Sequence, residues 1–120
     1  MAVSMDELEA IYQRGFQLRC DGRYSEARAE LQTVLAKDPS HIKARHQMGL
    51  IQGFEGDFDG SLATLADLAA DAPRNVDVLY DLAMTQMMLG SYDEACANFR
   101  KILTIDPNND RAQKQLVYCP

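Results

Sequence analysis

The chain has 120 residues, 47% of them hydrophobic and 25% charged, which suits one compact globular or solenoid unit. Its formal net charge of −6 excludes a general affinity for nucleic-acid phosphates, because such binding needs a clustered basic surface. The sequence has no apolar run of membrane-spanning length and no signal-peptide pattern at its start, so we expect a cytoplasmic protein without membrane insertion.

The first helix is predicted to begin at a capping box, because Ser4 and Glu7 can each satisfy a free amide at a helix start. Apolar residues then recur at helical spacing as far as Cys20. A second helix is predicted from about Ser25 to Lys37. It stops before Pro39, since proline disfavours helical geometry at the preceding residue.

The next two helices follow the same plan. One is predicted over about Ile42 to Phe54, with Ser40 as its N-cap. Either Asp57 or Asp59 then caps a helix that ends before Pro73.

The third pair has the clearest pattern. Asn75 is the expected cap of the fifth helix, and Ser91 or Asp93 is the expected cap of the sixth, which stops before Pro107. A last helical segment, at about 109–118, contains polar residues among its apolar ones. It is expected to cover the open end of the structure.

Three landmarks recur with a constant spacing of 34 residues. They are a turn glycine (Gly22, Gly56, Gly90), an aromatic residue two positions later (Tyr24, Phe58, Tyr92) and a closing proline (Pro39, Pro73, Pro107). A fixed period of this length indicates stacked helical repeats. We therefore expect one domain over residues 1–120, with repeats at 8–41, 42–75 and 76–109, and we expect the aromatic residues to fill the joints between repeats.

Small residues are predicted where the two helices of each repeat cross. They are Gly15, Gly49 and Ala83 in the first helices and Ala27, Ser61 and Ala95 in the second helices. Small side chains let two backbones approach closely, and a bulky residue there would cost about 1–3 kcal/mol by overpacking.

These positions resemble the signature of the tetratricopeptide repeat family over residues 8–109. The departures are Ser61 at the usual second-helix alanine, and Ile11, Arg45 and Leu79 at the family's early tryptophan position. The resemblance implies an all-α fold, a right-handed α-α superhelix of three antiparallel helix pairs plus a capping helix. It also implies a concave groove, lined by the first helix of each pair, that binds a peptide or helix of another protein.

The resemblance further implies which residues line that groove. Carried over repeat by repeat, they are Tyr12, Phe16, Arg19, Lys43, His46, Gln47, Leu50, Phe54, Asp77, Tyr80, Asp81, Met84 and Met88, and Arg111 and Lys114 of the capping helix extend them. Two readings stay open for the aromatic and methionine side chains among them. They either form a recognition surface or pack against neighbouring helices.

Family members that grip a chaperone's C-terminal carboxylate use lysine, asparagine and arginine at five positions. Here those positions hold Tyr12, Phe16, Gln47, Asp77 and Asp81. Two aspartates would repel a carboxylate, so this carboxylate clamp is predicted to be absent. We expect the groove to prefer an apolar or basic segment.

No residue pattern predicts catalysis, a metal site or a cofactor. Asp77 and Asp81 lie one helical turn apart without a nearby nucleophile, and His41 and His46 do not direct both rings at one ion. The expected function is therefore a protein-protein interaction module, adaptor-like or co-chaperone-like, and not an enzyme. The alternative is a structural scaffold that forms homo-oligomers, since the ends of repeat stacks can pair.

Three cysteines, Cys20, Cys96 and Cys119, are an odd number without a C-x-x-C spacing. This pattern indicates neither a disulfide framework nor a zinc site. We expect three reduced thiols, with Cys20 as a small buried residue.

Overall fold

The computed structural model describes residues 4–120, which form seven α-helices and no β-strand. The helices are α1 (Met5–Cys20), α2 (Tyr24–Lys37), α3 (Ile42–Phe54), α4 (Phe58–Asp71), α5 (Val76–Met88), α6 (Tyr92–Ile105) and α7 (Asp110–Leu116). Residues 1–3 of the expected domain lie outside the described residues. Within 4–120, no helix is long and apolar enough to cross a lipid bilayer.

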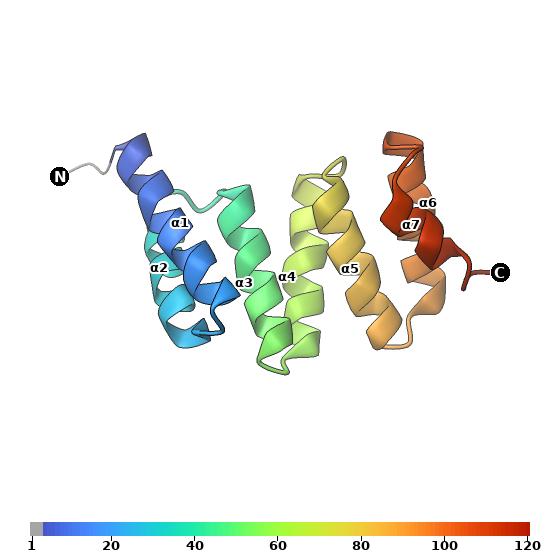
Figure 1. The fold of residues 1–120 in the computed structure, drawn as a ribbon, viewed down its shortest axis with the longest axis horizontal. Coiled ribbons are helices and arrows are strands. Elements are labelled where there is room, and N and C mark those ends of the chain that lie inside the picture. The colour runs from blue at the N-terminus through green and yellow to red at the C-terminus, as the bar shows by residue number, and fades with distance from the viewer. Residues whose placement is uncertain (1–3) are drawn as a thin grey trace.

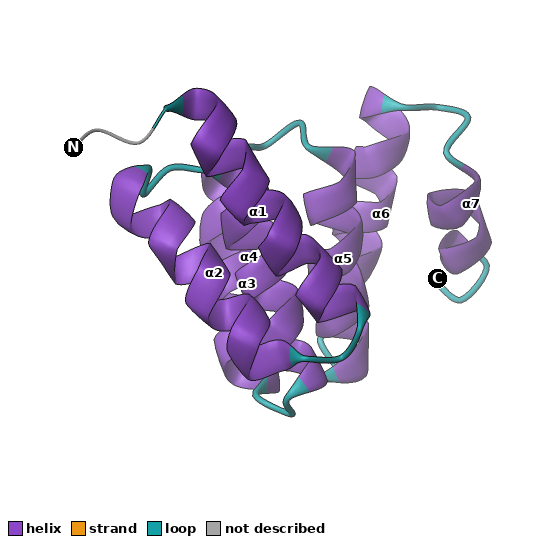
Figure 2. Ribbon diagram, turned by 60° about the vertical axis from the view of Figure 1, so that its left-hand side comes forward, coloured by secondary structure: helices purple, strands orange, loops and turns teal. Residues whose placement is uncertain are grey.

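The helices pack as antiparallel pairs, α1 with α2, α3 with α4 and α5 with α6 (Figure 1). Successive pairs lie side by side and form an elongated stack of 53 × 28 × 22 Å. The short helix α7 lies against α6 at the C-terminal end of this stack (Figure 2). The predicted all-α superhelix of three helix pairs and a capping helix is thus confirmed.

Side-chain caps begin several helices where the sequence predicts them. The Oγ of Ser4 accepts a hydrogen bond from the amide of Glu7 at 3.1 Å. Asp57 and Asn75 cap α4 and α5 in the same way. Of the two aspartates proposed for α4, Asp57 is therefore the cap.

The cap predicted for α3 is wrong. The Nδ1 of His41, and not Ser40, accepts the amide hydrogen of Ala44 at 3.0 Å. Ser40 instead donates its hydroxyl to the carboxylate of Asp38 at 2.9 Å, a stronger acceptor that lies only two residues away. Ser91 holds the cap position of α6 but makes no side-chain hydrogen bond there.

Small residues at the helix crossings explain the close packing within each pair. A Cβ added to Gly15 would lie 3.0 Å from the side chain of Leu31, and one added to Gly49 would lie 2.9 Å from that of Leu65. In the second pair, Ser61 stands where alanine is usual. Its buried hydroxyl is not left unpaired, because the Oγ donates to the carbonyl of Gly49 at 2.7 Å. The predicted crossing positions therefore pack as expected in these two pairs.

Only one of the three landmark aromatics fills a joint between pairs. Tyr24 stacks on Phe54 of the next pair, with ring centroids 5.6 Å apart. At the following joint, the position equivalent to Phe54 is Met88, which is 64% exposed and leaves Phe58 37% exposed. Tyr92 is 60% exposed because no further helix pair follows it. The prediction for Phe58 and Tyr92 is therefore wrong.

A disulfide bond contradicts the expectation of three reduced thiols. Cys96 on α6 is joined to Cys119, which follows α7, and their Cα atoms are 5.9 Å apart. The chain reverses after α7 and returns to α6, where Arg100 donates a hydrogen bond to the carbonyl of Pro120 at 2.9 Å. Cys20 keeps a free thiol and is exposed, so its expected burial is also wrong.

Candidate functional site

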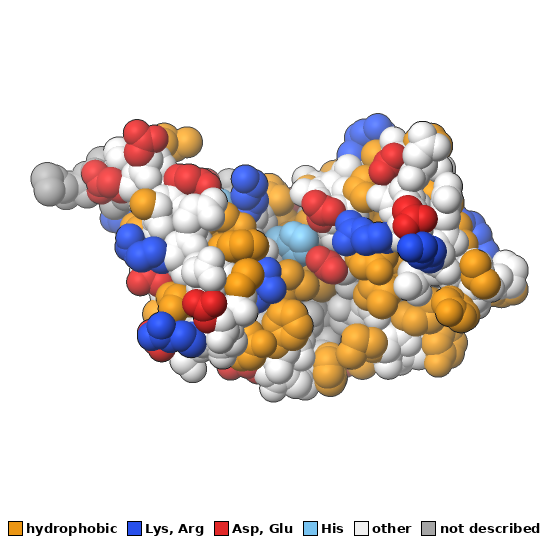
Figure 3. Space-filling view, viewed as in Figure 1, with side chains coloured by type: hydrophobic (Ala, Val, Ile, Leu, Met, Phe, Trp, Pro, Cys, Tyr) orange, Lys and Arg blue, Asp and Glu red, His pale blue; other side chains and the backbone are white. Residues whose placement is uncertain are grey.

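The concave face of the stack is hollowed between α1 and α7. Figure 3 shows this hollow at the centre of the molecule, with a histidine at its floor. It contains a cavity of about 430 Å³, here called the central cavity. Its lining residues are Tyr12, Gln13, Phe16, Lys43, His46, Gln47, Leu50, Asp77, Asp81 and Arg111.

Helical periodicity explains why α3 contributes the largest share of this lining. Lys43, His46 and Leu50 are separated by three and four residues, so they lie on one face of the helix. The opposite face carries Ala44 and Ile51, which are fully buried. The same sequence pattern that places the core therefore directs polar residues into the cavity.

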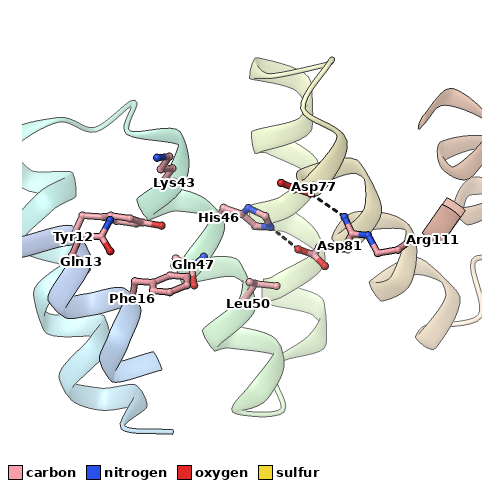
Figure 4. A pocket seen from close by; sticks show the side chains of 10 residues that line it. All are labelled: Tyr12, Gln13, Phe16, Lys43, His46, Gln47, Leu50, Asp77, Asp81 and Arg111. Carbon is pink, nitrogen blue, oxygen red and sulfur yellow. Dashed lines mark hydrogen bonds and ion pairs between the residues drawn. The ribbon is translucent and has the colours of Figure 1, made fainter. Parts of the chain in front are cut away.

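A hydrogen bond between adjacent helix pairs crosses the floor of the cavity. The Nε2 of His46 lies 2.7 Å from the Oδ2 of Asp81, and both side chains are partly buried (Figure 4). An ionised carboxylate can only accept, so Nε2 carries the hydrogen of this bond. The other oxygen of Asp81, Oδ1, receives no hydrogen bond from residues 4–120.

An ion pair forms the C-terminal wall. Arg111 of α7 donates to the Oδ1 of Asp77 at 2.9 Å (Figure 4). The same guanidinium lies 4.2 Å from the ring centroid of Tyr80, within the range of a cation-π contact. The ring of Tyr80 also meets Phe99 edge-on at 6.0 Å. Tyr80 is thus covered by its neighbours and does not line the cavity.

Aromatic side chains of α1 form the opposite wall. Tyr12 is buried against Phe16 and His41, with ring centroids 6.3 and 5.3 Å away. Burial raises the pKa of the Tyr12 phenol above its usual 10.0; the Glu9 carboxylate adds to this rise and Arg19 opposes it. Tyr12 is therefore a neutral wall residue at physiological pH.

Arg19 lies between Phe16 of this wall and Phe54 at the end of α3. Its Nε donates to the Oε1 of Gln47 at 2.7 Å, and its guanidinium lies 5.2 Å from the ring of Phe16 and 5.9 Å from that of Phe54. These contacts fix Arg19 in place. It orients Gln47, which does line the cavity, and does not line the cavity itself.

A second, smaller cavity adjoins the first at the turn end of α3 and α5. It has a volume of about 220 Å³ and is here called the apolar hollow. Its lining residues are Leu50, Gly53, Phe54, Phe58, Ser61, Asp81, Met84, Thr85 and Met88. Leu50 and Asp81 belong to both cavities, so the two form one continuous groove.

The predicted groove residues divide between these places. Tyr12, Phe16, Lys43, His46, Gln47, Leu50, Asp77 and Asp81 line the central cavity, and Phe54, Met84 and Met88 line the apolar hollow. Arg19 and Tyr80 line neither. The lining residues that were not predicted to lie there are Gln13, Gly53, Phe58, Ser61 and Thr85. Their placement depends on the angle between helix pairs, for which the sequence carries no local signal.

Comparisons with known proteins address the family and the fold. A family model described as tetratricopeptide repeat matches residues 55–114. No curated protein matches the chain.

Several solved structures have the same fold. The type III secretion translocator chaperone SycD of Yersinia enterocolitica is 18% identical, with a TM-score of 0.86 over 96% of this chain and 91% of SycD. The first TPR of Spaghetti (RPAP3), bound to an HSP90 peptide, is 16% identical, with a TM-score of 0.85 over 98% and 94%. PcrH in complex with the chaperone binding region of PopB is 19% identical, with a TM-score of 0.81 over 93% and 94%.

Proposed function

Because the chain belongs to the tetratricopeptide repeat family, we propose that it is a protein-interaction module whose concave groove binds a segment of a partner protein. The central cavity carries this proposal. It is lined by α1, α3, α5 and α7, so one bound segment would contact every helix pair and the capping helix. A site spread over several rigid helices suits an extended or helical segment better than a compact small molecule.

Solved structures of the same fold support the proposal. The RPAP3 domain holds an HSP90 peptide, and PcrH holds a segment of PopB. These proteins share under a fifth of their residues with this chain, so the partner itself does not carry over. We propose an adaptor-like or co-chaperone-like role, without catalysis.

The lining supports a groove without a carboxylate clamp. Asp77 and Asp81 stand where the clamp requires cations. The nearest guanidinium, that of Arg111, is already paired with Asp77. A terminal carboxylate placed beside Asp77 and Asp81 would meet two negative charges and lose its water, and the unpaired cation of the described lining, Lys43, lies on α3 and not beside them (Figure 4). We therefore propose that the groove takes an internal segment of its partner.

A peptide-display experiment tests this function. Random short peptides, with linkers on both sides, are selected on the immobilised full chain and on a Leu50→Gln variant. Leu50 lines both cavities and is only partly buried, so the variant keeps its helical circular dichroism spectrum while the groove changes. Val117→Ser, at an exposed apolar residue beyond α7, is the matched control.

We expect peptides that bind the wild type and the control but bind the Leu50 variant several-fold more weakly. If no peptide is enriched on the wild type, or if all three proteins bind the same peptides equally, the groove is not the binding site.

A further inference from the structure

We propose that the apolar hollow is an anchoring subsite for one bulky apolar side chain of the partner, and that the carboxylate of Asp81 pairs with a lysine or arginine next to that side chain. This inference rests on the proposed function and specifies the chemistry of the partner. It concerns the joint between the second and third helix pairs.

The hollow lies where the second joint differs from the first at equivalent positions of the repeats. At the first joint, Tyr24 stacks on Phe54 and the two rings fill the space. At the second joint, Phe58 stands in the place of Tyr24, but Met88 stands in the place of Phe54. Met88 does not cover Phe58, and the space that a ring fills at the first joint is open at the second.

The size of the hollow fits one side chain. Its volume is about 220 Å³, whereas an apolar cavity of roughly 150 Å³ accommodates one benzene-sized group. A leucine, methionine or phenylalanine side chain therefore fits, and a second large side chain does not. Met84 and Met88 have flexible thioether chains that can adjust to the shape of the group that enters.

The hydroxyl groups of the lining are already satisfied. Ser61 donates to the carbonyl of Gly49 at 2.7 Å, and Thr85 donates to the carbonyl of Asp81 at 2.9 Å. Neither hydroxyl therefore offers its hydrogen to a ligand. The surface left for contact consists of Leu50, Phe54, Phe58, Met84 and Met88, and Phe54 is 55% exposed. An apolar group that enters removes this surface from water, which favours binding.

Charge decides what accompanies the apolar group. Among the described residues that line the hollow, Asp81 is the only charged one. Its Oδ1 is free to accept a hydrogen bond, and its Oδ2 is paired with His46. Asp77, in contrast, is neutralised by the permanently charged Arg111. A basic residue of the partner therefore has its best site at Asp81, directly beside the hollow.

The test uses peptides selected on the wild-type chain from the random library described above. We expect the selected sequences to share one leucine, methionine or phenylalanine with a lysine or arginine close to it. Replacing the apolar residue with alanine in a labelled synthetic peptide should lower its affinity for the wild type at least about tenfold. The same replacement should have little effect on a Met84→Gln, Phe54→Ser double variant, which has already lost the subsite.

Paired variants test the charge. Asp81→Asn should lower the affinity for a basic peptide by up to about fivefold and reduce the salt dependence of its binding. Asp77→Asn is the matched control, and we expect a smaller effect because Arg111 already neutralises that carboxylate. Circular dichroism confirms the fold of each variant.

The outcomes separate the two proposals. If no peptide binds the wild type, the proposed function fails. Another outcome is that peptides are selected whose affinity falls in the Leu50→Gln variant but not in the double variant. In that case the groove binds partners without this subsite. Selection of acidic in place of basic residues, or equal effects at Asp77 and Asp81, would also overturn the inference.

Discussion

The disulfide between Cys96 and Cys119 should be a principal source of stability at the C-terminal end of the stack. Its contribution can be worked out from the length of the loop that it closes. The two cysteines are 23 residues apart. The loop-closure relation for that length gives about 11 cal/mol/K of entropy removed from the unfolded chain, or about 3.4 kcal/mol at 25 °C.

The best perturbation is Cys119→Ala. Cys96 is almost fully buried, so a serine there would add the cost of a buried hydroxyl, whereas its free thiol behaves as a small apolar group. Cys119 lies at the edge of the structure, and its loss removes the bond with little change in packing. Treatment of the wild type with a phosphine reductant breaks the same bond by another route and leaves both thiols free.

Urea unfolding followed by circular dichroism measures the effect. We expect the free energy of unfolding to fall by about 3 kcal/mol in Cys119→Ala. For a chain of 120 residues, such a loss corresponds to a decrease in Tm of about 12 °C. The reductant should reproduce this loss in the wild type and have no effect on the variant. Cys20→Ser, at the exposed free thiol, is the control and should unfold like the wild type.

Hydrogen exchange shows where the stability is lost. A repeat stack can open at one end without unfolding as a whole, so the amides of α7 should exchange faster in Cys119→Ala while those of α3 change little. The reasoning is refuted if the variant and the wild type unfold within about 0.5 kcal/mol of each other and α7 exchanges at the same rate in both. Free thiols at both positions in the untreated protein would also refute it. Disulfides persist in oxidising compartments, so the bond does not favour the cytoplasmic location that the sequence predicts.

Three further predictions concern packing, titration and ligand class. Gly49→Ala should cost about 1–3 kcal/mol in urea unfolding, because its Cβ would lie 2.9 Å from Leu65. Gly53→Ala, whose Cβ would meet its nearest neighbour at 3.4 Å, gains the same helix propensity and should cost less; equal losses would show that crowding against Leu65 is not the cause. Burial raises the pKa of Tyr12, so the folded state binds this proton more tightly than the unfolded state, and stability should fall as the pH rises above 10.0. Tyr12→Phe should remove that fall in a series of urea unfolding measurements at increasing pH, and an unchanged profile would contradict it. The HSP90 peptide SRMEEVD, held by the RPAP3 domain, should not bind this chain at concentrations up to about 1 mM in fluorescence anisotropy; binding at micromolar concentrations would contradict the absence of a carboxylate clamp.

The sequence alone determined the repeat architecture, because its signals are local. Turn glycines, helix caps and closing prolines act on residues within one turn of the chain, and they recur with a fixed period. Gly22, Gly56 and Gly90 have φ values of 78°, 89° and 82°, which L side chains rarely adopt. The repeat period also fixed which helix faces line the groove, since equivalent residues of each first helix point to the same side.

The tertiary structure decided how those residues meet. The pairs His46–Asp81 and Asp77–Arg111 join residues 35 and 34 positions apart, which is about one repeat. The period predicts that such positions are neighbours, but not which side chains bond. That choice depends on the angle between helix pairs and on the position of α7.

The disulfide and the apolar hollow depend on the same geometry. Cys119 meets Cys96 because the chain reverses after α7, and the hollow is open where Met88 leaves Phe58 uncovered. Neither follows from spacing, since a contact between distant residues depends on the orientation and volume of side chains from two helices at once. Local rules therefore fixed the fold, and packing between repeats decided the chemistry of the groove.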